Sequence, residues 1–364
     1  MHIVIDARRI NSSTGHYIER LIDELQLIDD KNNYTVVVLE KEKSHWKPSR
    51  PNFTVHTTTA DHYTFAEQLQ FAKLLYRLKP DFVHFSMPQQ PLLWNGRRIT
   101  TVHDTTLVRY ENLDQNKLLY RGRKLIFTNL LRNVIKRSDY VITPTEYVRG
   151  DLDKWTDGRF SDKFVVTHES GDMIHAKPEA VKELKGKQFL FFVGNAFPYK
   201  NLSRIVSAYA EAKYAHPELQ LVFAGKKEFF YEQLEADVAR RNIPDVHFLG
   251  YISDGEKRWL FQHASAYVCA SLSEGFHIPM IEAMYEQCPV ISSNATCLPE
   301  VGGDGALYFD PHSTDELVVA ITRLLDEPKL HEQLIKKGNY NVKRFSWKKM
   351  ARETHAIYEK MGRE

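Results

Sequence analysis

The chain has 364 residues, which is more than one ordinary hydrophobic core holds and predicts two domains of roughly 170 to 180 residues. A hydrophobic content of 43% with 26% charged residues excludes a disordered chain. Lys and Arg number 49 against 47 Asp and Glu, so the charge balance gives no reason to expect nucleic-acid binding.

Cysteine usage and the apolar segments indicate the compartment. Cys269, Cys288 and Cys297 lie in one half of the chain without the spacing of metal ligands, which is typical of a reducing cytoplasm. Residues 2–5 already read as a strand, without the charged start of a secretion signal. No apolar run approaches the ~18 residues that a membrane span needs. We therefore expect a cytoplasmic protein.

The first half alternates short apolar strands with helical patterns, which predicts a doubly wound parallel sheet of the α/β class. Strands are expected at residues 2–5, 34–39, 53–56, 82–85, 99–102 and 140–143. Gly15 lies in a tight turn between the first strand and a helix. Ligands of such sheets bind outside the carboxyl ends of the strands, so Gly15 is a candidate binding residue. The alternative is that it only shapes the turn.

His103 and Asp104 follow the strand at 99–102. A histidine at the carboxyl end of a strand can donate to a sugar hydroxyl, and the neighbouring carboxylate can accept from one. The alternative is a structurally bonded histidine beside an aspartate that caps its own loop.

Residues 115–137 form a long helical pattern whose charged residues are all basic: Lys117, Arg121, Arg123, Lys124, Arg132, Lys136 and Arg137. One interpretation is peripheral contact with anionic membrane lipid or attraction of an anionic acceptor. The other is the solvated face of an ordinary helix.

The second half repeats the alternation after a polar stretch with Gly and Pro at 171–186, which we interpret as a linker and not a core element. Strands are expected at residues 189–193, 219–224, 246–249, 266–270, 290–292 and 306–309. The domains are therefore expected at 1–170 and 187–345.

Lys200 follows the first of these strands. Asn201 is a plausible N-cap for the next helix, so the lysine would stand at a helix N-terminus and form an anion site. A preorganised ammonium there would stabilise the negative charge on a departing nucleoside diphosphate. A surface lysine is the alternative.

Glu274 and Glu282 frame a helix that follows the apolar run at 266–270. Eight residues of helix separate them by roughly 12 Å, which spans much of a nucleotide sugar. Backbone N–H groups of Gly275, Phe276 and His277 at the positive helix end could hold the diphosphate.

These motifs resemble the retaining group 1 glycosyltransferases with the GT-B architecture, two Rossmann-like domains facing each other across a cleft. Glu274 and Glu282 match that family's pair of glutamates, and the segment at 300–311 is similar to the one that follows the pair. Residues 345–347 and the tail resemble its last helix, so 346–364 is expected to pack back on the N-terminal domain. Residues 5–8 and 102–104 are similar to a subgroup rich in mannosyltransferases.

The resemblance implies a role for each matched residue. It assigns Glu274 to hydroxyls of the donor sugar, Glu282 to the ribose and Lys200 to the diphosphate. It brings His103 to the transferred sugar, and it adds the backbone of Ile278 to that of residues 275–277 in the phosphate and sugar cradle. It also implies an acceptor-binding N-terminal domain, retention of anomeric configuration, and no metal or other cofactor.

The sequence departs from the family at three places. His277 stands where glycine is common, and its imidazole could itself donate to a phosphate. Asn195 and Ala196 replace an arginine that pairs with the diphosphate, so Lys200 carries more of that charge, with Tyr199 or Arg204 as candidate helpers. Gln287 and Cys288 replace the glycine that usually ends the helix.

The expected function is transfer of a hexose, best mannose from GDP-mannose, to a glycan or lipid-linked acceptor. Two enzyme alternatives share this architecture, a nucleotide-sugar 2-epimerase and a glycan phosphorylase. A third alternative is a non-catalytic two-lobed sugar-binding protein.

Overall fold

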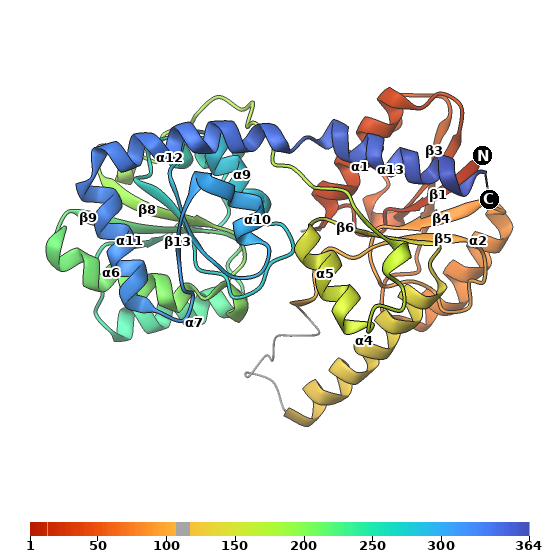
Figure 1. Ribbon diagram of the computed structural model, residues 1–364, viewed down its shortest axis with the longest axis horizontal. Coiled ribbons are helices and arrows are strands. Elements are labelled where there is room, and N and C mark those ends of the chain that lie inside the picture. Colours follow the sequence, from red (N-terminus) through yellow and green to blue (C-terminus); the bar gives the residue numbers. More distant parts are fainter. Residues whose placement is uncertain (13, 107–116, 364) are drawn as a thin grey trace. The chain divides into compact units, whose positions relative to one another are not determined.

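The computed structural model describes residues 1–12, 14–106 and 117–363, and of residues 117–124 and 126 only the backbone. The chain divides into two compact units. The first consists of Met1–Glu169 with Ser346–Glu364, and the second of Ser170–Phe345. Each unit contains one parallel sheet with helices against it (Figure 1), so the expected α/β architecture with two doubly wound sheets is confirmed.

The first unit has a seven-stranded sheet in the order β3-β2-β1-β4-β5-β6-β7, and every pair of neighbours is parallel. Its strands are β1 (His2–Asp6), β2 (Asn33–Leu39), β3 (Phe53–Thr58), β4 (Phe82–Phe85), β5 (Arg98–Thr101), β6 (Tyr140–Thr143) and β7 (Phe164–Val166). Its helices are α1 (Gly15–Ile28), α2 (Ala72–Leu78), α4 (Lys117–Arg137), α5 (Glu146–Trp155) and α13 (Trp347–Met361). The short edge strand β7 was not among the expected strands.

The second unit has a six-stranded parallel sheet in the order β10-β9-β8-β11-β12-β13. Its strands are β8 (Gln188–Val193), β9 (Leu219–Ala224), β10 (Val246–Phe248), β11 (Ala266–Cys269), β12 (Val290–Ser293) and β13 (Ala306–Phe309). Its helices are α6 (Leu202–Ala215), α7 (Phe229–Arg240), α8 (Asp254–His263), α9 (Ile278–Tyr285), α10 (Leu298–Gly302), α11 (Thr314–Asp326) and α12 (Pro328–Asn341).

Alternate strand residues build the cores. In the second unit Leu190 and Phe192 of β8 belong to one buried cluster with Ile205 of α6 and Ile321 of α11. In the first unit Val83 and Phe85 of β4 pack in the same way with Leu75 of α2. Phe189 and Phe191, on the opposite face of β8, are fully buried as well. Such burial on both faces explains why the parallel strands read as apolar runs in the sequence.

The terminal helix α13 returns to the first unit, where it lies beside α1 (Figure 1). The Tyr358 ring packs near Phe82, and the Tyr358 hydroxyl is hydrogen-bonded to His84 Nδ1 at 2.5 Å. Nε2 of His355, on the same helix, is hydrogen-bonded to Asp29 Oδ2 at 3.0 Å. Apolar and polar contacts together therefore fix α13 on this unit.

The strand order reverses between β1 and β4 in the first sheet and between β8 and β11 in the second. In open parallel sheets, ligands bind outside the carboxyl ends of the strands that flank this reversal. The segments after these four strands are therefore where a site is expected in each unit. Gly15 starts α1 next to one of them, and a Cβ there would lie 1.7 Å from the Ile10 carbonyl oxygen. The Ile10 backbone therefore leaves no room for a side chain at position 15. This agrees with the alternative that Gly15 shapes the turn.

Two expectations about local structure are corrected. Residues 171–186 belong to the second unit, and Ile174, Val181 and Leu184 are buried there although most of the stretch is polar. Asn201 stands at the N-cap of α6, but it has a positive φ of 57° and its side chain does not cap the helix. It donates instead to the carbonyl oxygens of Ala270 and Pro311 at 3.1 and 3.0 Å.

The basic helix predicted at 115–137 corresponds to α4. Residues 115 and 116 and the side chains of Lys117, Arg121, Arg123 and Lys124 lie outside what the structure describes. Of the described basic residues, Arg132 lies over the Trp155 ring and Arg137 donates to the carbonyls of Leu92 and Trp94. Membrane contact through this helix stays a prediction.

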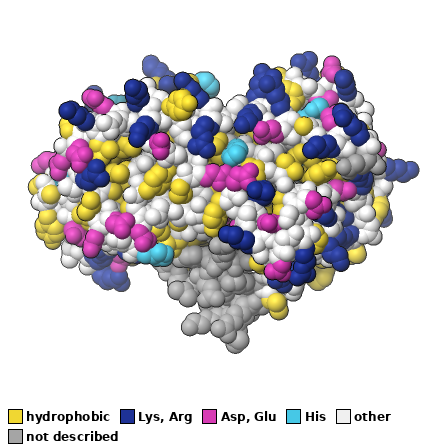
Figure 2. All heavy atoms as spheres, viewed as in Figure 1, with side chains coloured by type: hydrophobic (Ala, Val, Ile, Leu, Met, Phe, Trp, Pro, Cys, Tyr) yellow, Lys and Arg dark blue, Asp and Glu magenta, His cyan; other side chains and the backbone are white. Residues whose placement is uncertain are grey.

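Charges of both signs are interspersed on the face shown in Figure 2, in keeping with a formal net charge of +2. Within the described parts of the chain, no helix has both the length and the apolar character needed to cross a bilayer.

Candidate functional site

An ion pair between Lys200 and Glu274 lies at the reversal point of the second sheet. Lys200 ends a short turn, Pro198–Lys200, after β8, and Glu274 lies in the loop after β11. Lys200 Nζ is 2.6 Å from Glu274 Oε1, and the two side chains are 12% and 10% exposed. The Leu272 N–H donates to the Tyr199 carbonyl at 2.7 Å, which ties the two loops together. The topology thus joins residues that are 74 positions apart.

Both partners of this pair are charged. Burial alone would raise the pKa of the Glu274 carboxyl, but the Lys200 ammonium outweighs burial and the pKa falls. Burial alone would lower the pKa of Lys200, and the Glu274 carboxylate reverses that, so it rises. The ammonium also lies 5.2 Å from the centre of the Tyr199 ring. A fixed positive charge therefore stands at this loop in a largely water-excluded setting.

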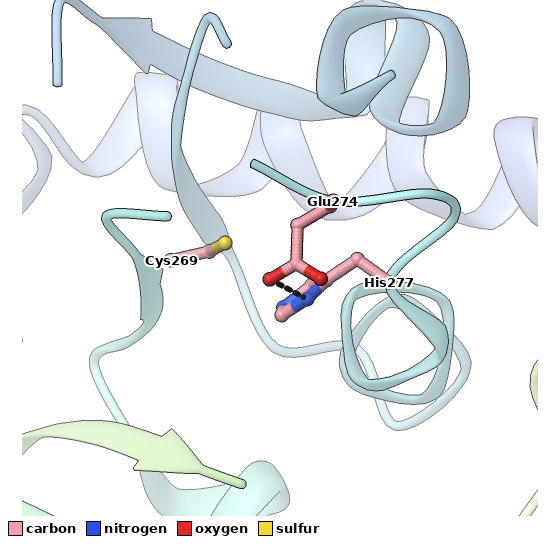
Figure 3. A group of neighbouring side chains, drawn as sticks. All are labelled: Cys269, Glu274 and His277. Atoms are coloured by element: carbon pink, nitrogen blue, oxygen red, sulfur yellow. Dashed lines mark ion pairs between the residues drawn. The ribbon is translucent and has the colours of Figure 1, made fainter. Parts of the chain in front are cut away.

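His277 supplies a second cationic group to Glu274. Its Nδ1 is 3.1 Å from Glu274 Oε1, an ion-pair distance, and its Nε2 is 2.8 Å from the Tyr267 hydroxyl. Burial opposes the imidazolium, but the neighbouring Cys269 and Glu274 raise the pKa of His277 to about 9. In Figure 3 the imidazole and the carboxylate point toward one another.

The imidazole of His277 is 2% exposed, so it faces the carboxylate beneath the loop. In this arrangement it is not presented to a phosphate, contrary to the role considered for it. The backbone of His277 has φ of 81°, in the left-handed region that glycine adopts most easily. The loop therefore keeps a glycine-like backbone although a histidine occupies the position.

Cys269 completes a cluster of three side chains whose donor atoms lie within 4.8 Å of one another, a spacing that metal ligands can adopt (Figure 3). Burial raises the pKa of the Cys269 thiol, and the neighbouring His277 outweighs this and lowers it. The Lys200 ammonium already lies against the carboxylate of the cluster. A divalent cation would have to displace that ammonium, so the charge arrangement disfavours a metal.

Glu282 lies on α9 and is 7% exposed. Its Oε1 is 3.1 Å from Lys257 Nζ of α8. For Glu282 and Glu274 alike, no contact of Oε2 is recorded among the described residues. Each glutamate thus has one oxygen held by a cation and a second oxygen that can accept a hydroxyl.

The other predicted donor-side residues are distributed around this loop. Gly275 and Ile278 flank Phe276, which is buried with its ring 5.2 Å from that of Phe345. Asn195 Oδ1 accepts from the Phe197 N–H at 3.4 Å. Arg204 Nη1 donates to the Thr314 hydroxyl at 2.7 Å, which directs it toward α11.

His103 lies in the first unit, after β5. Its Nε2 is 2.9 Å from the Ser86 carbonyl oxygen and its Nδ1 is 2.7 Å from Glu169 Oε1, so both ring nitrogens have acceptors. Burial would lower the pKa of His103, and Glu169 raises it. Asp104 accepts from the Thr106 N–H at 2.8 Å. These contacts fit the alternative of a structurally bonded histidine beside an aspartate that caps its own loop. To donate to a sugar hydroxyl, His103 would have to give up its hydrogen bond to Ser86 or to Glu169.

A buried charge cluster in the first unit was not anticipated. Arg8 is 1% exposed and donates to both oxygens of Asp6 and to Glu67 at 2.8 to 2.9 Å, and its guanidinium stacks 3.7 Å from the Phe71 ring. Asp6 and Arg8 directly follow the apolar residues of β1, which is the signal that could have indicated the pair. Thr296 was also missed, and its hydroxyl accepts from the Glu274 N–H at 3.1 Å.

Known proteins share this fold over nearly the whole chain. A solved structure of sucrose-phosphate synthase from Thermosynechococcus elongatus superposes with a TM-score of 0.79 at 17% identity and covers 99% of each chain. Two Rossmann-like units in this order define the GT-B class of fold, as expected.

Family comparisons identify the chain further. Residues 174–340 match the family described as Glycosyl transferases group 1, and residues 17–169 match Glycosyltransferase Family 4. O-antigen chain mannosyltransferase B of Escherichia coli is 26% identical over 278 residues, which cover 72% of this chain and 70% of that protein. MMP alpha-(1->4)-mannosyltransferase of Mycolicibacterium hassiacum is 37% identical over 168 residues, which cover 45% and 40%. The chain belongs to the group 1 glycosyltransferases, and the resemblance seen in its motifs is confirmed.

Replacement of His277 by Gln should destabilise the second unit in a pH-dependent manner. Because the folded pKa of about 9 is above the ordinary value of 6.5, the imidazolium stabilises fully below pH 6.5 and this stabilisation is lost as pH rises through 9. The full difference is on the order of 3 kcal/mol. Urea unfolding of both proteins across this range measures it.

His312→Gln is the matched control, because His312 is an exposed histidine of the same unit. It should leave the free energy of unfolding unchanged. A difference between His277→Gln and wild type that stays constant across the pH range would contradict a charged imidazole at Glu274.

Proposed function

We propose that this glycosyltransferase transfers mannose from GDP-mannose to a glycan or lipid-linked acceptor with retention of anomeric configuration. The observation that carries the proposal is the buried Lys200–Glu274 pair at the reversal point of the second sheet. The choice of sugar is supported by relatives that are named mannosyltransferases. GDP as the nucleotide rests on the same similarity.

In this proposal the second unit binds the donor. The open oxygen of Glu274 accepts from hydroxyls of the sugar, and that of Glu282 accepts from the ribose. Lys200 and the backbone N–H groups of residues 275–278 hold the diphosphate, because an ammonium and a helix N-terminus both favour anions. With no arginine at Asn195, Lys200 is the main cation for the leaving group.

The reaction proposed is a front-face substitution. The bond between the anomeric carbon and the diphosphate oxygen breaks, and the acceptor hydroxyl oxygen bonds to the same face of that carbon. The leaving phosphate oxygen takes the hydroxyl proton, so no protein base is required. Lys200 lowers the barrier because negative charge on the phosphate grows in the transition state. For His103 of the first unit, the family resemblance implies a role toward the transferred sugar.

The donor is tested by thermal shift with GDP-mannose, UDP-glucose and UDP-N-acetylglucosamine. GDP-mannose at 100 times its Kd should add about 2.7 kcal/mol to stability, because only the folded protein binds it. The uridine sugars should add much less at the same concentration. Stabilisation by a uridine sugar without stabilisation by GDP-mannose would exclude the proposed donor.

Glu274→Ala and Lys200→Ala should each lower kcat for mannosyl transfer by roughly 100-fold to 1000-fold, the range found for removal of one preorganised transition-state contact. Transfer of labelled mannose to a membrane or glycan extract measures this. Lys187→Ala, at an exposed lysine of the same unit, is the control and should transfer at the wild-type rate. Circular dichroism checks the fold of each variant, and a folded Lys200→Ala or Glu274→Ala protein with wild-type kcat would refute that residue's role.

Transfer should be independent of metal, since Lys200 provides the positive charge at the carboxylate. Treatment with EDTA followed by desalting should leave kcat and KM unchanged. Loss of activity on chelation that returns with added Mn²⁺ or Zn²⁺ would show that the Cys269, Glu274 and His277 cluster, or another site, holds a required ion.

A further inference from the structure

A polar pocket of about 720 Å³ lies in the second unit, away from the Lys200–Glu274 pair. Its walls come from the C-terminal ends of α8 and α9 and from α12, and α9 and α12 lie side by side (Figure 1). Because α8 and α9 lead directly into β11 and β12, the pocket is at the amino edge of the sheet, opposite the edge that carries the ion pair. We name it the amino-edge pocket. Its volume lies within the roughly 300 to 1,000 Å³ of known ligand pockets.

One wall of the amino-edge pocket carries a buried ion pair. The Glu286 side chain directly follows α9 and is 3% exposed, and its Oε2 accepts from Arg258 Nε at 3.1 Å. The same oxygen accepts from Gln262 Nε2 at 2.7 Å. Arg258 also donates to the Ala176 carbonyl at 3.0 Å. The carboxylate is therefore held in place by two donors from α8.

The other carboxylate oxygen, Glu286 Oε1, is buried and has no hydrogen-bond partner among the described residues. A buried acceptor without a donor is destabilising, and such groups in folded proteins call for an explanation. The last torsion of a glutamate side chain is broad, so a small rotation turns Oε1 toward the pocket that Glu286 lines. Glu286 can then accept a hydrogen bond from a ligand that enters.

The charges of the amino-edge pocket disfavour an ionic ligand. Apart from two histidines, Arg258 and Glu286 are the charged residues among the described ones that line it, and they pair with each other. An anion would meet the carboxylate, and a cation would meet the guanidinium. His263 and His331 do not form a metal-ligand group with Glu286, because the one such group in the described parts of the chain is the Cys269 cluster. An uncharged ligand is therefore expected.

The remaining walls combine hydrogen-bonding groups with flat or apolar faces. His263 donates from Nδ1 to the Trp259 carbonyl at 2.8 Å and stacks on the Trp259 ring with 4.4 Å between ring centres, which fixes its plane. The other lining groups are amide, hydroxyl and apolar side chains: Gln262, Ser265, Tyr285, Gln287, Met173 and Ile335. Sugars present hydroxyls around the edge of a ring and C–H groups on its faces, so this mixture suits a sugar.

We propose that the amino-edge pocket binds an oligosaccharide, as a second site that holds part of the glycan on which the enzyme acts. Sugar hydroxyls donate to Glu286 and exchange hydrogen bonds with the amide and hydroxyl side chains, and the ring faces lie on the apolar walls. The four residues of β11 put roughly 13 Å between the two edges of the sheet, so only a chain of several sugars reaches from one to the other. The choice of mannose as the sugar rests on the proposed function.

Calorimetric titration of the full-length protein with α-linked mannotetraose, without any donor, tests the pocket. The wild type should bind. Ser265→Tyr should abolish this binding, because its ring fills the pocket and no side-chain hydrogen bond of Ser265 is recorded among the described residues. Glu286→Gln should weaken binding roughly tenfold, since hydrogen bonds to a charged acceptor are about twice as strong as neutral ones. Lys200→Ala, at the opposite edge, should bind as the wild type does.

Matched controls come from α7 of the same unit. Ala239→Tyr adds the same ring and Glu232→Gln the same loss of charge at exposed positions, and both should bind as the wild type does. Circular dichroism verifies the fold of each variant. Because no donor is present, failure of the proposed GDP-mannose reaction leaves this result intact. Binding of maltotetraose or chitotetraose alone, abolished by Ser265→Tyr, would support the carbohydrate pocket and count against mannose.

Three results would overturn the proposal. The first is that the wild type binds none of these oligosaccharides at millimolar concentration. The second is unchanged binding by folded Ser265→Tyr and Glu286→Gln proteins, which would place the sugar elsewhere. The third is binding of inorganic phosphate and of no oligosaccharide, again abolished by Ser265→Tyr, which would make the pocket an anion site.

Discussion

The buried ion pair between Lys200 and Glu274 is the interaction on which the ligand edge of the second unit depends. Removing two charges from water costs several kcal/mol per ion, and only close geometry with further polar contacts recovers it. Here the contact is 2.6 Å and the His277 imidazole adds a second cation. Because an uncompensated buried charge would be costly, the loops after β8 and β11 are held at one separation.

Hydrogen bonds to main-chain groups make that separation rigid. The Asn201 side chain donates to the carbonyls of Ala270 and Pro311, so one amide joins the loops that follow β8, β11 and β13. The Leu272 N–H adds a bond to Tyr199, and the Thr296 hydroxyl fixes the N–H of Glu274 itself. Since these bonds hold backbone, the charged side chains extend from a frame that does not have to rearrange when charge develops nearby, which is the condition for electrostatic catalysis.

The fold could be read from the sequence because parallel strands are buried on both faces, and segments such as residues 189–193 appear as uninterrupted apolar runs. The family resemblance assigned Lys200 and Glu274 to neighbouring parts of one donor, but their direct ion pair was not predicted. Side-chain direction could not be read. Sequence spacing does not tell that the His277 ring turns beneath its loop or that Asn201 bonds carbonyls and leaves its helix uncapped. Buried Arg8 was missed because an arginine is rarely fully buried unless paired; Asp6, two residues away, was an available signal, but the second partner Glu67 is remote in sequence.

His277 shows how a position that favours glycine can take a side chain. A left-handed backbone at a residue with a Cβ costs about 1 to 2 kcal/mol. The imidazole offsets this by its contacts with Glu274 and the Tyr267 hydroxyl. Gln287, with φ of 59°, keeps the left-handed backbone at the end of the same segment in the same way. His277 and Gln287 therefore both keep a left-handed backbone at the two ends of α9, where glycine is absent. His277 also adds a cation that holds Oε1 of Glu274, and Oε2 can then accept a hydroxyl.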